Sequence, residues 1–216
     1  MIVLNLKTYQ ESIDKCLLFC DIANEVVAES GLRIIVCPPT PFLKDAAEKS
    51  VVFAQHVDFE EPGAFTGTVN SEMLKAICVK GSIINHSESK LAEANIKKTI
   101  DALHRNSLES LVCAATTNEA VKIAGDSPTF IAVEPPELIG SGVSVSKAKP
   151  EIVINSVRAI KDVNHKVTVL CGAGVSNKSD VKKAIELGSE GVLLASAFVK
   201  SKDPKEFLRD LSTAFE

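Results

Sequence analysis

The stretch Ser82-Ile83-Ile84-Asn85 runs directly into His86-Ser87-Glu88-Ser89, so a short apolar run ends on an imidazole. The pattern recurs further along, where Phe130-Ile131-Ala132-Val133 runs into Glu134-Pro135-Pro136. A buried β-strand is expected to be apolar along its length, and a reactive side chain at its end needs a reason. In parallel α/β proteins, the carboxyl ends of the strands carry the chemistry. The two runs therefore predict two parallel strands that bring a base and an acid together for proton transfer.

Runs of this kind alternate with amphipathic stretches from one end of the chain to the other. We expect strands at 2–6, 33–37, 51–55, 82–85, 109–113, 129–133, 166–171 and 191–195. We expect helices near 12–29, 40–48, 70–79, 89–105, 117–124, 147–162, 178–187 and 204–214. Glycines between helices and the following strands are expected to end helices, at positions Gly31, Gly81, Gly125 and Gly188.

Eight strand–helix pairs in 216 residues fit a compact (β/α)8 barrel. No linker, repeat or low-complexity tract suggests a second domain, so we expect one domain over residues 1–216. A doubly wound open sheet shows the same alternation. No Gly-x-Gly-x-x-Gly follows the first strand, which disfavours the dinucleotide-binding form of that alternative. The barrel is favoured.

Composition excludes several classes of function. The net charge is −4, no basic run is present, and the chain has one Tyr and no Trp, which argues against nucleic-acid binding. No apolar run approaches the roughly 20 residues that span a bilayer, and no signal peptide is visible. The six cysteines include no Cys-x-x-Cys pair and read as small buried side chains of a cytoplasmic protein. We expect neither a metal nor a cofactor.

Asn5 and Lys7 lie two residues apart on the first predicted strand, so their side chains point the same way. Late in a barrel strand, that direction is inward at the mouth of the barrel. Lys7 would bring a cation to a site in an acidic protein, which suits an anionic substrate. Taken alone, a lysine that simply reaches solvent at the strand end is an equally good interpretation.

His86 precedes serines that can cap a helix starting near residue 89. A histidine at a helix N-terminus is disfavoured as imidazolium by the helix dipole. A neutral ring can donate a hydrogen bond to a carbonyl without giving up a full proton. The alternative is a structural histidine. The other three histidines, His56, His104 and His165, are expected to be structural or surface residues.

Glu134 follows four apolar residues and precedes two prolines. A partly desolvated carboxylate there has a raised basicity, as the removal of a proton from carbon requires. The segment 137–142, between Pro135-Pro136 and Ala148-Lys149-Pro150, has the composition of a lid that closes over a substrate, or of an ordinary surface loop.

Two late turns are rich in small residues. Cys171-Gly172-Ala173-Gly174-Val175 follows the seventh predicted strand, and Leu194-Ala195-Ser196-Ala197 ends the eighth. Small residues let backbone N–H groups approach an anion, and a short helix start adds its dipole. The loops after strands seven and eight are the usual phosphate site of such barrels.

With these residues in view, the chain closely resembles the triosephosphate isomerases, and specifically their short archaeal type. The matching segments are Asn5-Leu6-Lys7, Ala54-Gln55-His56, Gly63-Ala64-Phe65-Thr66-Gly67, Asn85-His86-Ser87-Glu88-Ser89, Val133-Glu134-Pro135-Pro136-Glu137-Leu138-Ile139-Gly140-Ser141-Gly142 and Cys171-Gly172-Ala173-Gly174. They cover nearly the whole chain in order, and the histidine and glutamate segments are highly specific.

The resemblance implies a TIM barrel that interconverts glyceraldehyde 3-phosphate and dihydroxyacetone phosphate in glycolysis and gluconeogenesis. It implies that Glu134 moves the proton, that His86 polarises the carbonyl, and that Lys7 with Asn5 stabilises the enediolate while Glu88 holds Lys7. It also implies that phosphate is bound by backbone amides near Ile139, Gly140, Gly174, Ala195 and Ser196. A homodimer or homotetramer with the loop 56–67 at the interface is implied as well.

Two other readings share the barrel. The first is another phosphosugar enzyme, such as an aldolase or a ring-forming lyase. A Schiff-base aldolase needs a desolvated inner-strand lysine, and Lys7 is the one candidate, although its neighbours fit an electrostatic role better. A non-catalytic barrel could bind a phosphorylated metabolite and regulate another process. Glu134 argues against that reading, since an added carboxylate does not help to bind a dianion.

Overall fold

The computed structural model describes residues 1–134 and 149–216. Its strands are β1 (Ile2–Asn5), β2 (Ile34–Cys37), β3 (Phe53–Ala54), β4 (Gly81–Ile84), β5 (Glu109–Ala114), β6 (Phe130–Val133), β7 (Thr168–Cys171) and β8 (Gly191–Leu194). Its α-helices are α1 (Gln10–Asp14), α2 (Cys16–Ser30), α3 (Leu43–Ala47), α4 (Ser71–Ala76), α5 (Glu93–Arg105), α6 (Thr117–Gly125), α8 (Pro150–Val163), α9 (Lys178–Glu186), α10 (Ser196–Val199) and α11 (Pro204–Ser212). The 3₁₀ helices within the described residues are η1 (Thr40–Phe42) and η3 (Thr213–Phe215).

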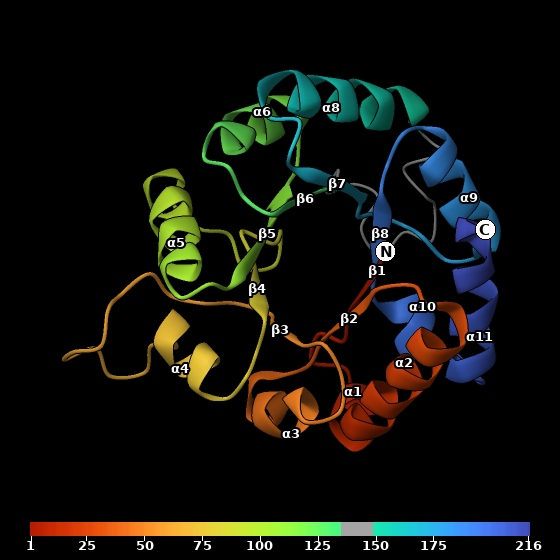
Figure 1. Ribbon diagram of the computed structural model, residues 1–216, viewed down its shortest axis with the longest axis horizontal. Helices are drawn as coiled ribbons and strands as arrows, with labels where there is room; N and C mark the ends of the chain where they lie inside the picture. The colour runs from red at the N-terminus through yellow and green to blue at the C-terminus, as the bar shows by residue number, and fades with distance from the viewer. Residues whose placement is uncertain (135–148) are drawn as a thin grey trace.

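The eight strands form one parallel sheet in the order β2-β1-β8-β7-β6-β5-β4-β3. The first strand pairs with the last, and in this register Ile2 lies opposite Val192. A bridge between Val36 and Val52 joins the two end strands and closes the ring. Helices surround this ring on the outside (Figure 1). The predicted (β/α)8 barrel is confirmed.

Strand alternation sorts the apolar side chains into two cores. On β1, Val3 packs inside the barrel, whereas Ile2 and Leu4 pack outward against the helices. The inner core comprises Val3, Ile35, Cys37, Phe53, Ile83, Leu111, Cys113, Phe130, Ala132, Leu170 and Leu193. The barrel is therefore a packed core up to its mouth, and a ligand can enter only at an end of the strands.

The glycines differ from their predicted role in one instructive case. Gly31 ends α2 with a φ of 68°, as predicted. Gly81, in contrast, is the first residue of β4, where an added Cβ would lie 2.3 Å from the carbonyl oxygen of Glu109. This glycine allows close strand packing and does not end a helix.

Several element boundaries also differ from the prediction. The first predicted helix divides at Lys15 into α1 and α2, and the third strand keeps only two residues. Five of the six cysteines are buried, and Cys78 is exposed. In the described residues, no helix is long and apolar enough to cross a membrane.

Candidate active site

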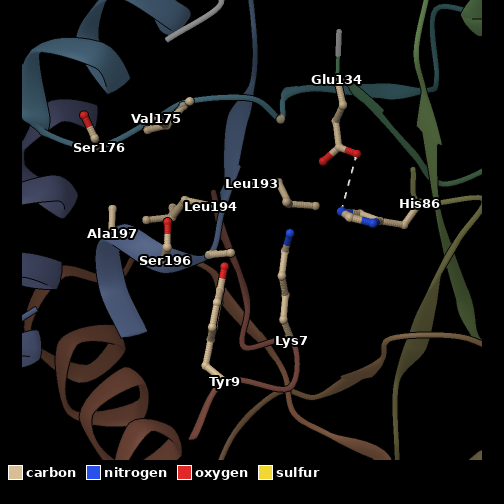
Figure 2. Close-up of a pocket in the computed structure, with 13 residues that line it drawn as sticks. Lys7, Tyr9, His86, Glu134, Val175, Ser176, Leu193, Leu194, Ser196 and Ala197 are labelled. Carbon is tan, nitrogen blue, oxygen red and sulfur yellow. Dashed lines mark ion pairs between the residues drawn. The ribbon is translucent and has the colours of Figure 1, made fainter. Parts of the chain in front are cut away.

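A pocket lies at the carboxyl ends of the barrel strands, where Glu134, His86 and Lys7 face one another (Figure 2). Glu134 follows β6 directly, and the other two lie just beyond β4 and β1. The described residues that line it are Lys7, Tyr9, His86, Glu134, Gly172, Gly174, Val175, Ser176, Leu193, Leu194, Ala195, Ser196 and Ala197. Three reactive side chains from distant segments thus share one hollow.

Glu134 enters the pocket by strand register. Phe130 and Ala132 point into the barrel, and Glu134 continues the same alternation one position beyond the strand. Its side chain is 2% exposed. Gly172 gives it room, because a Cβ there would lie 2.5 Å from Cγ of Glu134. The carboxyl group is therefore confined between β5 and β7.

The environment of Glu134 makes its carboxylate a stronger base than an ordinary glutamate. Burial raises its pKa to about 7, while a hydrogen bond with Cys113 and the positive charge of Lys7 act in the opposite direction. Its buried Oε2 has no hydrogen-bond partner within the described part of the chain. A buried acceptor with this basicity is suited to remove a proton from a bound molecule.

His86 is held as a neutral ring with one nitrogen toward the base. Its Nδ1 accepts a hydrogen bond from the N–H of Glu88 at 3.1 Å, which places the ring proton on Nε2. Nε2 lies 3.7 Å from Oε2 of Glu134. Burial lowers the pKa of His86, and the charge of Lys7 lowers it further. The ring can therefore donate from Nε2 to an oxygen in the pocket.

The predicted reason for this neutral state is wrong. The helix after His86 begins at Glu93, not near residue 89, and its N-cap residue is Ala92, which has no capping side chain. Residues 87–89 form a turn, in which the N–H of Ser89 donates to the carbonyl of His86. Desolvation and the Glu88 N–H, rather than a helix dipole, keep the ring neutral.

Lys7 is held at three points. Its N–H donates to Oδ1 of Asn5 at 3.1 Å, and its carbonyl accepts from Nε2 of Gln55 at 3.0 Å. Its ammonium lies 2.5 Å from Oε1 of Glu88. The backbone adopts a φ of 48°, which is uncommon outside glycine, so these bonds fix an unusual conformation. Asn5 and Glu88 line a hollow that adjoins the main pocket and shares Lys7 and His86 with it.

The opposite wall of the pocket is made of small residues. Gly174 has a φ of 70°, and Ala195 is the N-cap residue of α10. The first N–H groups of a helix have no partner within the helix, so those that follow Ala195 can serve a ligand. Ser196 also lines this wall. Ile139 and Gly140, the other predicted phosphate contacts, lie outside the described residues, as does the predicted lid.

Sequence reasoning missed three neighbours of the reactive groups. Tyr9 lines the pocket, and its ring lies 4.8 Å from the ammonium of Lys200. The sequence signal for Tyr9 is its position two residues beyond Lys7, which indicates that it lies near the same end of the barrel. Gly172 stood in a glycine-rich turn but was not linked to Glu134. Cys113 was read only as a buried side chain, because its contact with Glu134 depends on the pairing of β5 with β6.

The comparison with known protein families agrees with this geometry. The model of the family described as triosephosphate isomerase matches residues 1–213. The chain belongs to the triosephosphate isomerase family. Its barrel is similar to the crystal structure of triosephosphate isomerase from Bartonella henselae, with a TM-score of 0.77 at 19% identity over 99% of this chain and 98% of that one. At that identity, the structural likeness supports the fold alone.

Similar proteins are found among archaea, as the resemblance implied. Triosephosphate isomerase of Methanothermus fervidus is 48% identical over 99% of this chain and 97% of its own. That of Methanocaldococcus jannaschii is 47% identical over 98% of each chain. The family membership thus extends over the whole described barrel.

Proposed function

We propose that this protein interconverts D-glyceraldehyde 3-phosphate and dihydroxyacetone phosphate at the Glu134–His86–Lys7 pocket. The observation that carries the proposal is the buried carboxylate of Glu134, with a pKa near 7, facing a neutral imidazole donor at 3.7 Å. A base and a hydrogen-bond donor on the same bound molecule are what an aldose–ketose isomerisation requires. The family membership of the chain supports the same reaction.

Glu134 takes the proton from the hydroxyl-bearing carbon next to the carbonyl group and returns it to the former carbonyl carbon. His86 gives its Nε2 proton to the carbonyl oxygen and takes back the proton of the neighbouring hydroxyl group, so both transferred protons are accounted for. The electrons of the broken C–H bond form the enediolate, whose oxygen takes the negative charge. No net oxidation occurs, because the aldehyde and the ketone are isomers. Because the pKa of Glu134 lies near neutral pH, its carboxylate accepts the proton and the resulting acid releases it with comparable ease.

His86 and Lys7 stabilise the charge that develops on the substrate oxygens. The Nε2–H of His86 donates to the carbonyl oxygen, and the Lys7 ammonium lies at the same mouth (Figure 2). Glu88 and Asn5 fix Lys7, through the ammonium and the backbone N–H respectively. Charged groups that are already in place need no reorganisation when the enediolate forms.

The phosphate group occupies the small-residue wall opposite the base. Backbone amides near Gly174, Ala195 and Ser196 bind it. Ile139 and Gly140, which lie outside the described residues, are the other phosphate contacts that the resemblance implies. Of the described residues that line the pocket, Lys7 carries a permanent positive charge and balances part of the phosphate dianion.

A coupled assay tests the proposal. Purified protein is given glyceraldehyde 3-phosphate, and dihydroxyacetone phosphate is followed by its reduction. We expect turnover without added metal or cofactor, and its loss by about three orders of magnitude in Glu134→Gln. Binding of a phosphoglycolate-type analogue without turnover would favour a regulatory barrel instead. Absence of both would reject the pocket as a triose phosphate site.

The protein works as a homodimer or homotetramer in the cytoplasm. The segment between β3 and α4 projects from the barrel (Figure 1) and carries Phe65 at 52% exposure. An exposed aromatic side chain on a projecting loop suits burial against a second copy of the chain. Size-exclusion chromatography with light scattering of wild type and Phe65→Ala measures whether loop 56–67 supports the assembly.

A further inference from the structure

Asn85 reverses the strand alternation that would otherwise turn His86 away from the pocket. Ile83 points into the barrel and Ile84 outward, so regular alternation would point residue 86 outward as well. Asn85 instead adopts a left-handed φ of 59°. His86 consequently lines the catalytic pocket, while Asn85 lines a separate groove beside α5 and α6. The position of the imidazole therefore depends on one strained residue.

The side chain of Asn85 makes three hydrogen bonds that hold that conformation. Its Nδ2 donates to the carbonyl of Cys113 and to Oε1 of Glu119, each at 2.9 Å. Its Oδ1 accepts from the N–H of Leu91 at 3.2 Å. The amide is 1% exposed and links the end of β5, helix α6 and the loop before α5. Asparagine is among the few residues that tolerate a left-handed backbone.

Glu119 is in turn fixed relative to the barrel. Its Oε2 accepts from the N–H of Ala115 at 2.7 Å, and its Oε1 also accepts from Nζ of Lys90 at 2.9 Å. Its own N–H donates to the side chain of Thr116, the N-cap residue of α6. The carboxylate is thus an anchor at the start of α6, against which the Asn85 amide is held.

We propose that Asn85 and Glu119 are positioning residues that hold His86 in the pocket. Neither is among the residues that line the pocket, so both act through the turn that carries the imidazole. The bonds from Asn85 stabilise the left-handed turn, and Glu119 fixes the orientation of the Asn85 amide. The role of His86 as hydrogen-bond donor rests on the function proposed above; the placement of its ring does not.

Two substitutions separate backbone strain from hydrogen bonding. Asn85→Gly keeps the left-handed φ without strain but removes all three side-chain bonds. Glu119→Ala keeps the asparagine at position 85 but removes the carboxylate to which its Nδ2 donates. Asn118→Ala is the matched control, because Asn118 neighbours Glu119 on α6 and is exposed. We expect Asn85→Gly and Glu119→Ala to lower kcat about tenfold or more with KM changed less than about twofold, and the control to match wild type.

Nitrogen NMR of the His86 ring supplies a readout that general destabilisation does not move. In wild type we expect a protonated Nε2 and an unprotonated Nδ1 that accepts from Glu88. In both variants these two resonances should shift or broaden under conditions where the protein is folded. Wild-type kcat together with unchanged His86 resonances in either folded variant would overturn the proposal, even if its melting temperature fell. If wild type shows no isomerase activity, the resonances alone decide.

Discussion

The ends of β6 and β4 bring Glu134 and His86, the two groups proposed to act in the proton transfer, into the pocket in different ways. Glu134 reaches the pocket by continuing the alternation of its strand, so no special backbone conformation is needed. His86 reaches it because Asn85 interrupts the alternation with a left-handed turn. One group is placed by its own segment, and the other by hydrogen bonds from residues distant in the sequence.

The two ends also differ in what they cost the fold. The carboxylate of Glu134 is buried with its pKa raised, so its ionised form is disfavoured by the protein around it. The His86 ring is buried in the neutral form that burial favours, with its Nδ1 bonded. We therefore expect substitutions at the end of β6 to change the position or the charge of the Glu134 carboxylate. Substitutions at the end of β4 should change the orientation of the His86 ring.

The largest effect is expected from shortening the base. Glu134→Asp withdraws the carboxylate by one methylene from a pocket whose other groups are fixed. We expect kcat to fall about 10²–10³-fold, because a displacement of this size removes the aligned proton transfer. Affinity for a phosphoglycolate-type inhibitor should remain within about threefold, since the phosphate wall is unchanged. An unaltered kcat would mean that Glu134 is not the base.

A methyl group at Gly172 should displace the side chain of Glu134 while leaving its carboxyl group chemically unchanged. The added Cβ would lie 2.5 Å from Cγ and 2.9 Å from Oε1 of Glu134, so the side chain must move. We expect Gly172→Ala to lower kcat about 10–10²-fold while the protein stays folded. Gly125→Ala is the control, because an added Cβ there meets nothing within 4 Å. Equal activity in the two variants would show that the contact with Gly172 does not fix the base.

The difference between the two strand ends explains how much could be predicted from sequence. Periodicity located all eight strands, and the position of Glu134 at a strand end predicted its place at the barrel mouth. Lys7 also lines the pocket, but from a turn with a φ of 48° beyond β1, which strand alternation does not predict. The inward turn of His86 could not be predicted, because the left-handed Asn85 is bonded to Glu119, which lies on helix α6 and 34 residues further along the chain. Local composition predicts serine capping of a helix near residue 89. In the structure, residues 87–89 form a turn in which the N–H of Ser89 donates to the carbonyl of His86.

Removal of the charge at β6 should stabilise the protein in a pH-dependent way. The folded pKa of Glu134 is about 7, above the ordinary glutamate value of 4.5 expected in the unfolded chain, so the contribution of this side chain to stability is fully present below pH 4.5. As the pH rises through 7, this contribution of Glu134 to the free energy of unfolding is lost. The loss totals about 3 kcal/mol, since each unit of difference between the folded and unfolded pKa corresponds to about 1.4 kcal/mol.

Glu134→Gln has no such charge, so we expect it to be more stable than wild type at about pH 8.5 and to differ much less at about pH 5. Urea titrations at both pH values measure the difference, in which the titration of groups distant from Glu134 cancels. A difference that stays constant with pH would show that the carboxylate is not desolvated in the folded state.

The smallest effect concerns the start of α5, which the structure separates from His86. Ala92 is the exposed N-cap residue of α5 and offers the first-turn amides no side-chain acceptor. Ala92→Ser should therefore stabilise the protein by about 0.5–1 kcal/mol, measured by urea titration, with kcat unchanged. Ser89→Ala is the matched control and should leave the free energy of unfolding within about 0.5 kcal/mol, since helix α5 begins four residues later. A loss of about 1 kcal/mol in Ser89→Ala, with none gained in Ala92→Ser, would mean that α5 starts near residue 89 in solution. His86 would then lie at a helix N-terminus after all, and a helix dipole would help to keep the imidazole neutral.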